Sequence, residues 1–398
     1  MVNKKTTPSQ EKIRRVYILV GESSGDLHAA GVVKELQKLA PQIQFFGTGG
    51  ANLKACQVNL SFHVQDLAVM GFTEILPKFF FFWRVFRKVK QEIKNLKPDL
   101  VLLVDYPGFN LRLAKAIKKK FPHPVVYFIP PSVWAWKEER AELLKAYCDK
   151  IIGIFPFEKD FYQKKKIAFQ YFGNPLAYQL RNYPKDPTRF RKNLGLDAHQ
   201  KIVCLLPGSR SSAIKKSLPI FQQLAKELKK EKIFFVWCLS INLNQKDKAL
   251  FDFVQKEPNQ GLKIGENWDC LAHSDFSICA GSTASLESSL LGCPYVLVYQ
   301  ASAFSYGYLK KFYPLPYFSL PNICLGRSAF AEYVQENFTS GNLKHEILHY
   351  FSDLPHQKKL SQAILELKNL LQVEETPYRL VAQCLFKDFL KKPPQTKG

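Results

Sequence analysis

The chain has 398 residues, enough for two domains, and its hydrophobic content of 46% is ordinary for a globular protein. Lys and Arg outnumber Asp and Glu by 57 to 34, and the net charge of +23 points to an anionic partner such as nucleic acid, a phospholipid surface or a phosphorylated substrate. A lysine-rich solvated surface explains the same charge. No stretch predicts a signal peptide or a transmembrane helix. The scattered cysteines suit reduced thiols in a cytoplasm.

Short apolar runs alternate with amphipathic stretches along the whole chain. Continuous apolar strands separated by helices are typical of parallel sheets that are covered on both faces. After the first run we expect a loop, Gly21–Asp26, and then a helix, Leu27–Leu39. The predicted strands are Val16–Val20, Leu100–Val104, Val125–Ile129, Ile151–Phe155, Ile202–Leu206, Phe234–Leu239, Phe276–Ala280 and Tyr295–Tyr299.

The strand pattern occurs twice, on either side of the polar stretch Asn182–Asn193, which we interpret as a linker. This predicts an α/β fold with two doubly wound, Rossmann-like domains and an interdomain cleft at the carboxyl ends of both sheets. The expected domains are residues 1–181, residues 194–372, and a C-terminal helix and tail, 373–398, that packs back on the N-terminal domain.

Two loops of the first half carry candidate functional residues. The sequence GESSGD, Gly21–Asp26, is a Ser- and Gly-rich turn before a helix, where free backbone N–H groups can hold an anion, although many such turns are only helix caps. Asp105 follows the predicted strand Leu100–Val104. A carboxylate at the end of a buried strand can act as a general base, or it can simply cap a helix or order the loop.

Two loops of the second half suit a nucleotide diphosphate. Pro207–Arg210 reads PGSR, in which Gly208 permits close approach and the arginine fork matches phosphate oxygens. Gly281, Ser282 and Thr283 precede a helix that contains Glu287, a carboxylate suited to ribose hydroxyls. Each loop alone is a weak signal, and the pair is a stronger one.

Seven segments in one order resemble the family of lipid-A-disaccharide synthases, inverting glycosyltransferases of the GT-B type. The resemblance runs from about Val16 to beyond Glu332, and the SVWAW and SLPN…GR blocks are its most specific parts. The segments are GESSGD, LAVMGFTEIL, KPDLVLLVDYPGFN, PPSVWAWKEER, FPFEKDFY, LLPGSR and SLPNICLGR.

The resemblance implies transfer of 2,3-diacylglucosamine from its UDP derivative to 2,3-diacylglucosamine 1-phosphate, with no bound metal or other cofactor. Asp105 would be the catalytic base. The N-terminal domain would bind the acceptor and the C-terminal domain the UDP-sugar. The implied donor-binding residues are Ser209, Arg210, Gly281, Ser282, Thr283, Glu287, Asn322, Arg327 and Gln335, and the implied acceptor-binding residues are Glu22, Ser23, Ser24, Asp26, Ser132 and Trp134.

The sequence departs from the family pattern at three positions. The usual GHP with a later aspartate is replaced by a Gly-Asn-Pro that contains Asn174, followed by Tyr178. Ala213 stands where the family often has glutamate. These changes leave the predicted reaction class intact and bear on the substrate preference.

Three alternatives compete with this interpretation. His345–His349 spells H-E-x-x-H, a zinc-protease signature, with Glu366 as a third ligand, but we interpret both histidines as ordinary helix-surface residues. A UDP-N-acetylglucosamine 2-epimerase could share the fold and donor site. A nucleic-acid-binding protein would explain the charge, but no nucleic-acid module is recognised. A homodimer is left open.

An aromatic run with basic neighbours predicts contact with an anionic membrane surface. The run is Phe79, Phe80, Phe81, Phe82 and Trp83, continued by Val85 and Phe86, and the next acidic residue is Glu92. We therefore expect a cytoplasmic protein attached peripherally to the inner membrane. The competing interpretation is a helix buried against the sheet.

Overall fold

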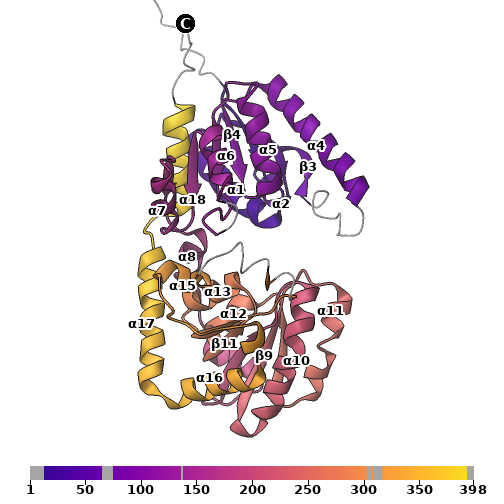
Figure 1. Ribbon diagram of the computed structural model, residues 1–398, viewed down its shortest axis with the longest axis vertical. Coiled ribbons are helices and arrows are strands. Elements are labelled where there is room, and N and C mark those ends of the chain that lie inside the picture. Colours follow the sequence, from indigo (N-terminus) through magenta and orange to yellow (C-terminus); the bar gives the residue numbers. More distant parts are fainter. Residues whose placement is uncertain (1–12, 65–74, 136–137, 303–305, 308–315, 392–398) are drawn as a thin grey trace, which may run out of the picture. The chain divides into compact units, whose positions relative to one another are not determined.

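The computed structural model describes residues 13–64, 75–135, 138–302, 306–307 and 316–391, and it describes no side chains for 75–80. The chain divides into two compact units. Unit 1 contains Met1–Pro175 and Val373–Gly398, and unit 2 contains Leu176–Gln372. Each unit has a parallel sheet with helices packed on it (Figure 1), which confirms the predicted α/β class.

The sheet of unit 1 has the strand order β3-β2-β1-β4-β5-β6-β7, and every pair is parallel. The direction of winding reverses between β1 and β4, which is the topological switch point of a doubly wound fold. The strands are β1 (Arg15–Leu19), β2 (Gln44–Gly49), β3 (Asn59–His63), β4 (Leu100–Val104), β5 (Val125–Phe128), β6 (Lys150–Gly153) and β7 (Phe169–Tyr171).

Helices cover both faces of this sheet, because its central strands are apolar on both sides. In β1, Val16 and Ile18 face one core and Tyr17 and Leu19 the other. All residues of β4 are fully buried. The helices are α1 (Ser23–Leu39), α2 (Ala51–Ala55), α4 (Ile75–Leu96), α5 (Pro107–Lys118), α6 (Arg140–Tyr147), α7 (Glu158–Lys164), α18 (Pro377–Leu385) and the π-helix η4 (Phe386–Leu390).

The C-terminal helix α18, yellow in Figure 1, packs beside α1. The Tyr378 ring lies against Gly31, where a Cβ atom would come within 2.6 Å of it. The Tyr378 hydroxyl is 2.9 Å from His28 Nδ1, and burial lowers the pKa of His28 to about 4. Val381, Ala382 and Leu385 complete the same core as β1 and α1, so the last segment of the chain helps to build unit 1.

The sheet of unit 2 has the order β10-β9-β8-β11-β12-β13, again with parallel pairs only. Its switch point lies between β8 and β11. The strands are β8 (Lys201–Leu206), β9 (Ile233–Leu239), β10 (Gln260–Ile264), β11 (Phe276–Cys279), β12 (Tyr295–Tyr299) and β13 (Glu332–Val334). All the strands predicted in both halves are present, with ends that agree within two residues.

The helices of unit 2 cover its sheet in the same manner. The boundary with unit 1 falls inside α8 (Pro175–Leu180). The others are α9 (Pro187–Asn193), α10 (Ser211–Glu227), η1 (Lys229–Glu231), α11 (Gln245–Ala249), η2 (Asp252–Lys256), α12 (Asn267–His273), α13 (Ser282–Leu291), α15 (Leu320–Leu325), η3 (Gln335–Asn337), α16 (Ser340–Ser352) and α17 (Leu354–Leu371).

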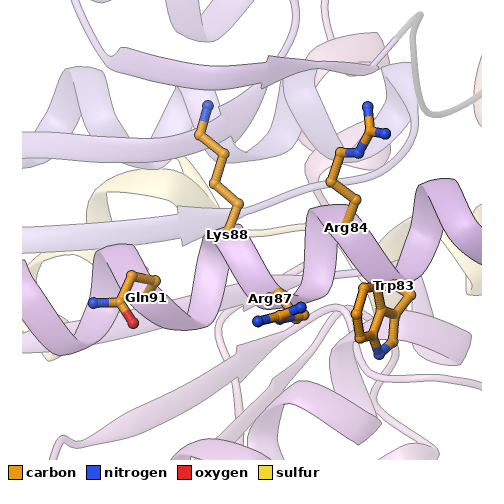
Figure 2. A pocket seen from close by; sticks show the side chains of 5 residues that line it. All are labelled: Trp83, Arg84, Arg87, Lys88 and Gln91. Atoms are coloured by element: carbon orange, nitrogen blue, oxygen red, sulfur yellow. The ribbon is translucent and has the colours of Figure 1, made fainter.

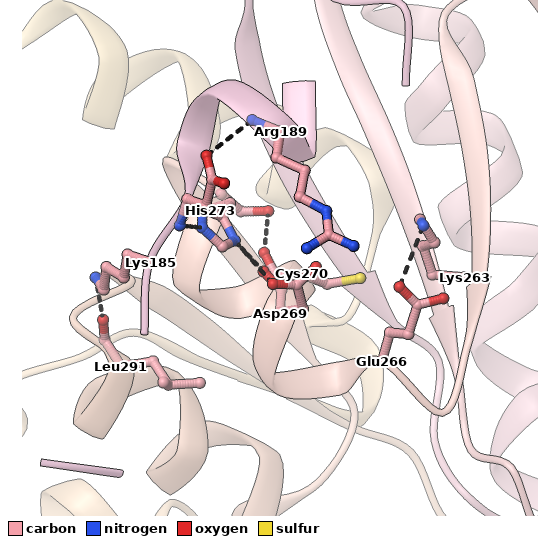
Figure 3. Close-up of polar contacts among 10 residues, drawn as sticks. Lys185, Arg189, Lys263, Glu266, Asp269, Cys270, His273 and Leu291 are labelled. Atoms are coloured by element: carbon pink, nitrogen blue, oxygen red, sulfur yellow. Dashed lines mark hydrogen bonds and ion pairs between the residues drawn. The ribbon is translucent and has the colours of Figure 1, made fainter. Parts of the chain in front are cut away.

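The stretch interpreted as a linker, Asn182–Asn193, lies within unit 2 and contains α9. Figure 3 shows how it is held. The Asp186 backbone N–H donates to His273 Nε2 at 2.8 Å, while His273 Nδ1 lies 2.8 Å from the Asp269 carbonyl. The Phe190 ring stacks on His273 at 4.9 Å, and Lys185 Nζ donates to the Leu291 carbonyl.

Candidate active site

The first candidate site lies at the carboxyl ends of β1 and β4, beside the switch point of unit 1. Asp105 follows β4 directly, and φ angles of +51° and +50° place Asp105 and Tyr106 in the left-handed region. Partial burial, followed by the negative charge of Glu22, raises the pKa of the Asp105 carboxyl. This position and this raised pKa suit a general base.

The predicted loop at Gly21–Asp26 is mostly helix, because α1 begins at Ser23. Glu22, Ser23 and Ser24 are exposed at this helix start, at the carboxyl end of β1. The first turn of a helix has N–H groups without helical partners, so these residues suit contact with a polar or anionic acceptor group.

Asp26 has a structural role in the same segment. Its side chain is 2% exposed, and its carboxylate accepts hydrogen bonds from the backbone N–H groups of Gly50, Asn52 and Leu53 at 2.6–3.2 Å. The Asn52 side chain adds a further bond at 2.9 Å. These donors form the amino end of α2, which Asp26 therefore caps from outside the helix. The carboxylate of Asp26 is thus engaged within unit 1, so its contribution to acceptor binding would be indirect.

Ser132 and Trp134 follow β5 on the same edge of the sheet. Ser132 is exposed. The Trp134 ring meets Phe157 edge to face at 4.7 Å, and its side chain hydrogen-bonds to Glu158, which lowers the pKa of that carboxyl.

Glu158, which the sequence reasoning did not single out, lies after β6 on this edge. Its side chain is only 3% exposed, and burial raises its pKa to about 7. The backbone N–H groups of Ile154 and Phe155 donate to Glu158 Oε2 at 3.2 and 3.0 Å. These two hydrogen bonds lower the pKa and so offset part of the effect of burial. The segment FPFEKDFY contains this residue, but no sequence pattern reveals its burial.

The second candidate site lies at the carboxyl ends of β8 and β11 in unit 2. Ser209 and Arg210 are exposed after β8, and Arg210 is the residue before the first turn of α10. The Arg210 charge lowers the pKa of Tyr299, which burial raises, so the guanidinium lies near the end of β12. Gly208 has a φ of +114°, and a Cβ atom there would come 2.9 Å from the Cβ of Ala213.

The loop after β11 forms the amino end of α13. Gly281 is the residue before the helix, Ser282 begins it, and Thr283 is exposed in its first turn. The Ser282 hydroxyl accepts the backbone N–H of Leu320 at 2.8 Å. Burial raises the pKa of Glu287 one turn later. Free backbone N–H groups at a helix start and an exposed arginine are features that suit a diphosphate.

Asn322 and Gln335 have their amide groups engaged within unit 2. Asn322 is fully buried: its oxygen accepts the N–H groups of Ala329 and Phe330 at 3.0 Å, and its nitrogen donates to Glu332. The oxygen of Gln335 accepts the Ala301 N–H at 2.6 Å, and its nitrogen donates to the Ala301 carbonyl. These side chains hold loops in place, so their contribution to donor binding would be indirect.

The H-E-x-x-H segment lies on α16. His349 contacts Asp353 at 3.0 Å and stacks on His356, and Glu346 is buried beside Tyr333. Glu366 forms an ion pair with Arg327, a predicted donor residue, instead of approaching the histidines. In the described part of the chain, no group of three or more His, Cys, Asp or Glu side chains is arranged to hold a metal ion.

Helix α4 has a core face and an exposed face. Val85, Val89 and Ile93 are buried against the sheet, so Val85 is wrong as a membrane contact. Phe86 packs on Phe109 and also belongs to the core side. The apolar spacing of four residues explains this, because residues i and i+4 share a helix face.

The aromatic run itself is divided between these environments. Trp83 is 51% exposed, whereas Phe81 packs partly against the core and also contacts Phe82. Phe79 and Phe80 belong to α4, but their side chains lie outside the described part. Among the helices that the structure describes, none has the length and apolarity to cross a bilayer.

The three residues that depart from the family pattern each have defined neighbours in the structure. Asn174 is 1% exposed and its amide donates to the Ile154 carbonyl at 3.1 Å. The Arg181 guanidinium lies over the Tyr178 ring, 4.1 Å from the ring centre. Ala213 lies beside the turn at Gly208, where its Cβ would be 2.9 Å from a Cβ added to that glycine.

A model of the family described as lipid-A-disaccharide synthetase matches residues 16–384. Lipid-A-disaccharide synthase 1 of Legionella pneumophila (strain Paris) is 37% identical over 364 residues, which cover 90% of this chain and 93% of that protein. Lipid-A-disaccharide synthase of Myxococcus xanthus is 33% identical over 359 residues, with coverage of 90% and 93%.

Solved structures share the fold at much lower identity. UDP-GlcNAc 2-epimerase from Neisseria meningitidis bound to UDP-GlcNAc has a TM-score of 0.61 at 14% identity and covers 95% of this chain and 100% of that chain. The calicheamicin glycosyltransferase CalG4 has a TM-score of 0.61 at 13% identity, with coverage of 96% and 100%. These likenesses show the fold alone.

The raised pKa of Glu158 predicts a pH-dependent stability that Glu158→Gln removes. A folded-state pKa of about 7, above the ordinary 4.5, favours folding below pH 4.5, and this contribution is lost as the pH rises to about 7. Between these limits the wild type should lose on the order of 3 kcal/mol of unfolding free energy relative to Glu158→Gln. The Gln oxygen can accept the same two backbone bonds. Urea unfolding from pH 4.5 to 8 measures the difference.

The exposed Glu142 on α6 provides a matched control. Glu142→Gln should follow the wild type at every pH. Equal pH profiles for wild type and Glu158→Gln would show that Glu158 stays ionised in the folded protein.

Proposed function

Because the chain belongs to the lipid-A-disaccharide synthase family, we propose that unit 1 binds the lipid acceptor and unit 2 the UDP-sugar donor. The family membership makes it a glycosyltransferase of lipid A biosynthesis. The relatives reported above share the family name, so neither the epimerase nor the nucleic-acid-binding alternative is favoured.

The proposed reaction transfers 2,3-diacylglucosamine from its UDP derivative to the 6-hydroxyl of 2,3-diacylglucosamine 1-phosphate. Asp105 takes the hydroxyl proton while the acceptor oxygen attacks the anomeric carbon from the face opposite UDP. The bond to the UDP oxygen breaks, the anomeric centre inverts, and the products are the β-1′,6-linked disaccharide 1-phosphate and UDP. The observation that carries this proposal is a carboxyl of raised pKa at the switch point of unit 1.

On the donor side, Arg210 and the first turn of α13 supply positive charge for the diphosphate. Charge that grows on the leaving UDP is stabilised by fixed donors that need no rearrangement. Glu287, partly buried one turn further along, would accept a hydrogen bond from a ribose hydroxyl. Ser209 and Thr283 are exposed on the same edge and can add bonds to phosphate oxygens.

We also propose that the protein is cytoplasmic and attaches to the inner membrane through the exposed face of α4. Trp83, Arg84, Arg87, Lys88 and Gln91 line a cavity of about 520 Å³ on this helix (Figure 2). The Arg87 guanidinium lies 4.5 Å from the centre of the Trp83 ring. An aromatic side chain with surrounding cations suits the interface of an anionic bilayer.

Asp105→Asn should fold normally and lose activity by about 100- to 10,000-fold, the usual effect of removing a general base. The base must be ionised, so activity rises with pH through the pKa of Asp105. Because the charge of Glu22 raises that pKa, Glu22→Gln should shift the rise of activity with pH to lower pH values. Turnover by mass spectrometry across pH tests both variants. An Asp105→Asn enzyme with wild-type turnover would remove the base assignment.

Arg210→Ala should weaken UDP binding by roughly one to two decades, since a charge-assisted bond contributes about 1.5–3 kcal/mol. Calorimetric titration with UDP measures the effect. Arg189 is an exposed arginine on α9 of the same unit (Figure 3) and serves as the control, because Arg189→Ala removes an equal charge. Equal UDP affinity in both variants would exclude Arg210 from the diphosphate site.

Trp83→Ser should leave the fold intact and weaken binding to vesicles with anionic lipid by about tenfold or more, since burial of a large apolar side chain contributes roughly 1.5–3 kcal/mol. Cosedimentation measures bound protein. Leu354→Ser removes a 66%-exposed apolar side chain from unit 2 and should bind like the wild type. If both variants bind equally well, α4 is not the attachment site.

A further inference from the structure

The turn after β4 is strained, although it contains no glycine at its two left-handed positions. Asp105 and Tyr106 have φ angles of +51° and +50° in succession. A left-handed conformation costs an L residue roughly 1–2 kcal/mol, and such residues persist only where surrounding contacts hold them. The contacts that hold this turn therefore determine where the Asp105 carboxyl lies.

Two buried side chains hold the main chain of Asp105. The Tyr127 hydroxyl, from β5, donates to the Asp105 carbonyl at 2.6 Å. The Asn110 amide, from α5, donates to the same carbonyl at 2.8 Å and also lies 3.3 Å from the Val104 carbonyl and 3.5 Å from that of Leu19. Both side chains are completely buried.

Packing against α1 and the segment after β1 further restricts the turn. The Tyr106 ring lies directly over Gly21, where a Cβ atom would come within 2.2 Å of it. The Cβ of Asp105 stands beside Gly25 of α1, at 3.8 Å from an added Cβ. The Asp105 side chain is thus directed over the first turn of α1, beside Glu22, by a main chain that cannot rotate freely.

We propose that Tyr127 and Asn110 are positioning residues, which hold Asp105 in its left-handed conformation so that its carboxyl meets the acceptor hydroxyl. Loss of either donor leaves the Asp105 carbonyl short of a bond and lets the turn relax toward an ordinary conformation. The carboxyl then moves while the fold remains. This inference rests on the proposed role of Asp105 as the base.

Tyr127→Phe is the sharpest test, because it deletes one oxygen atom from a ring that keeps its place. We expect kcat to fall about tenfold or more, because small misplacements of a reacting group are costly, with KM for both substrates changed less than about threefold. Tyr162→Phe is the control: Tyr162 is equally buried in the same core, and its hydroxyl has no hydrogen-bond partner among the described residues. It should keep wild-type kcat.

A double-mutant cycle separates positioning from general damage. If Tyr127 acts through Asp105, adding Tyr127→Phe to Asp105→Asn should lower the residual rate no further. If the two substitutions lower the rate independently, so that their effects multiply in the double variant, the inference is wrong. It is also wrong if Tyr127→Phe is as active as Tyr162→Phe. Asn110→Ala should show the same loss of kcat if it folds. If it does not fold, the Tyr127→Phe single and double variants alone test the positioning role. If Asp105→Asn alone keeps full turnover, the base assignment has failed instead.

Discussion

Parallel pairing of every strand sends all carboxyl ends of a sheet to one edge, and the other features of this protein depend on that constraint. The doubly wound order then opens a crevice where the connections turn to opposite faces. In unit 1 this point lies between β1 and β4, and in unit 2 between β8 and β11. Residues far apart in the sequence, such as Glu22 and Asp105, become electrostatic neighbours only through this topology.

Motif residues at these edges divide into two kinds that look alike in the sequence. In the proposed reaction, Asp105 and Arg210 present their charged groups to the substrates. Asp26, Asn322 and Gln335 use their polar atoms to satisfy backbone groups of neighbouring loops. Buried backbone N–H groups need such partners, so a family can require these residues as strongly as those that touch substrate.

The strands with continuous apolar runs were predictable from the sequence, because both of their faces are buried. The strands β2, β3, β7, β10 and β13 were not predicted. β7 and β13 are half-buried along their length, β3 and β10 are half-buried except at one end, and β2 mixes polar with apolar residues, so their sequences lack the same run. Most lie near or at a sheet edge, where hydrophobic patterning is weakest.

The candidate site was predictable only in part, for a related reason. Sequence places Asp105 after a buried strand, but it does not reveal the left-handed turn, nor that Tyr127 and Asn110 converge on one carbonyl oxygen. Glu158 was missed because its burial depends on the turn after β6, where the backbone N–H groups of Ile154 and Phe155 bind its carboxylate. The exposed side of α4 was overestimated, since an aromatic run alone does not distinguish Val85, which faces the core, from Trp83, which faces water.

The two units share the doubly wound strand order, with seven described strands in unit 1 and six in unit 2, but they carry opposite charges at their switch points. Unit 1 places Glu22 and Asp105 there, and the mutual repulsion of their charges helps to keep the Asp105 pKa high. Unit 2 places Arg210 and the amino end of α13 there. An arginine beside Asp105 would lower the pKa of its carboxyl and make it a weaker base. Carboxylates beside Arg210 would repel a diphosphate. In the proposed reaction, the carboxyl that takes the proton and the cationic donors of the diphosphate are therefore carried by different units.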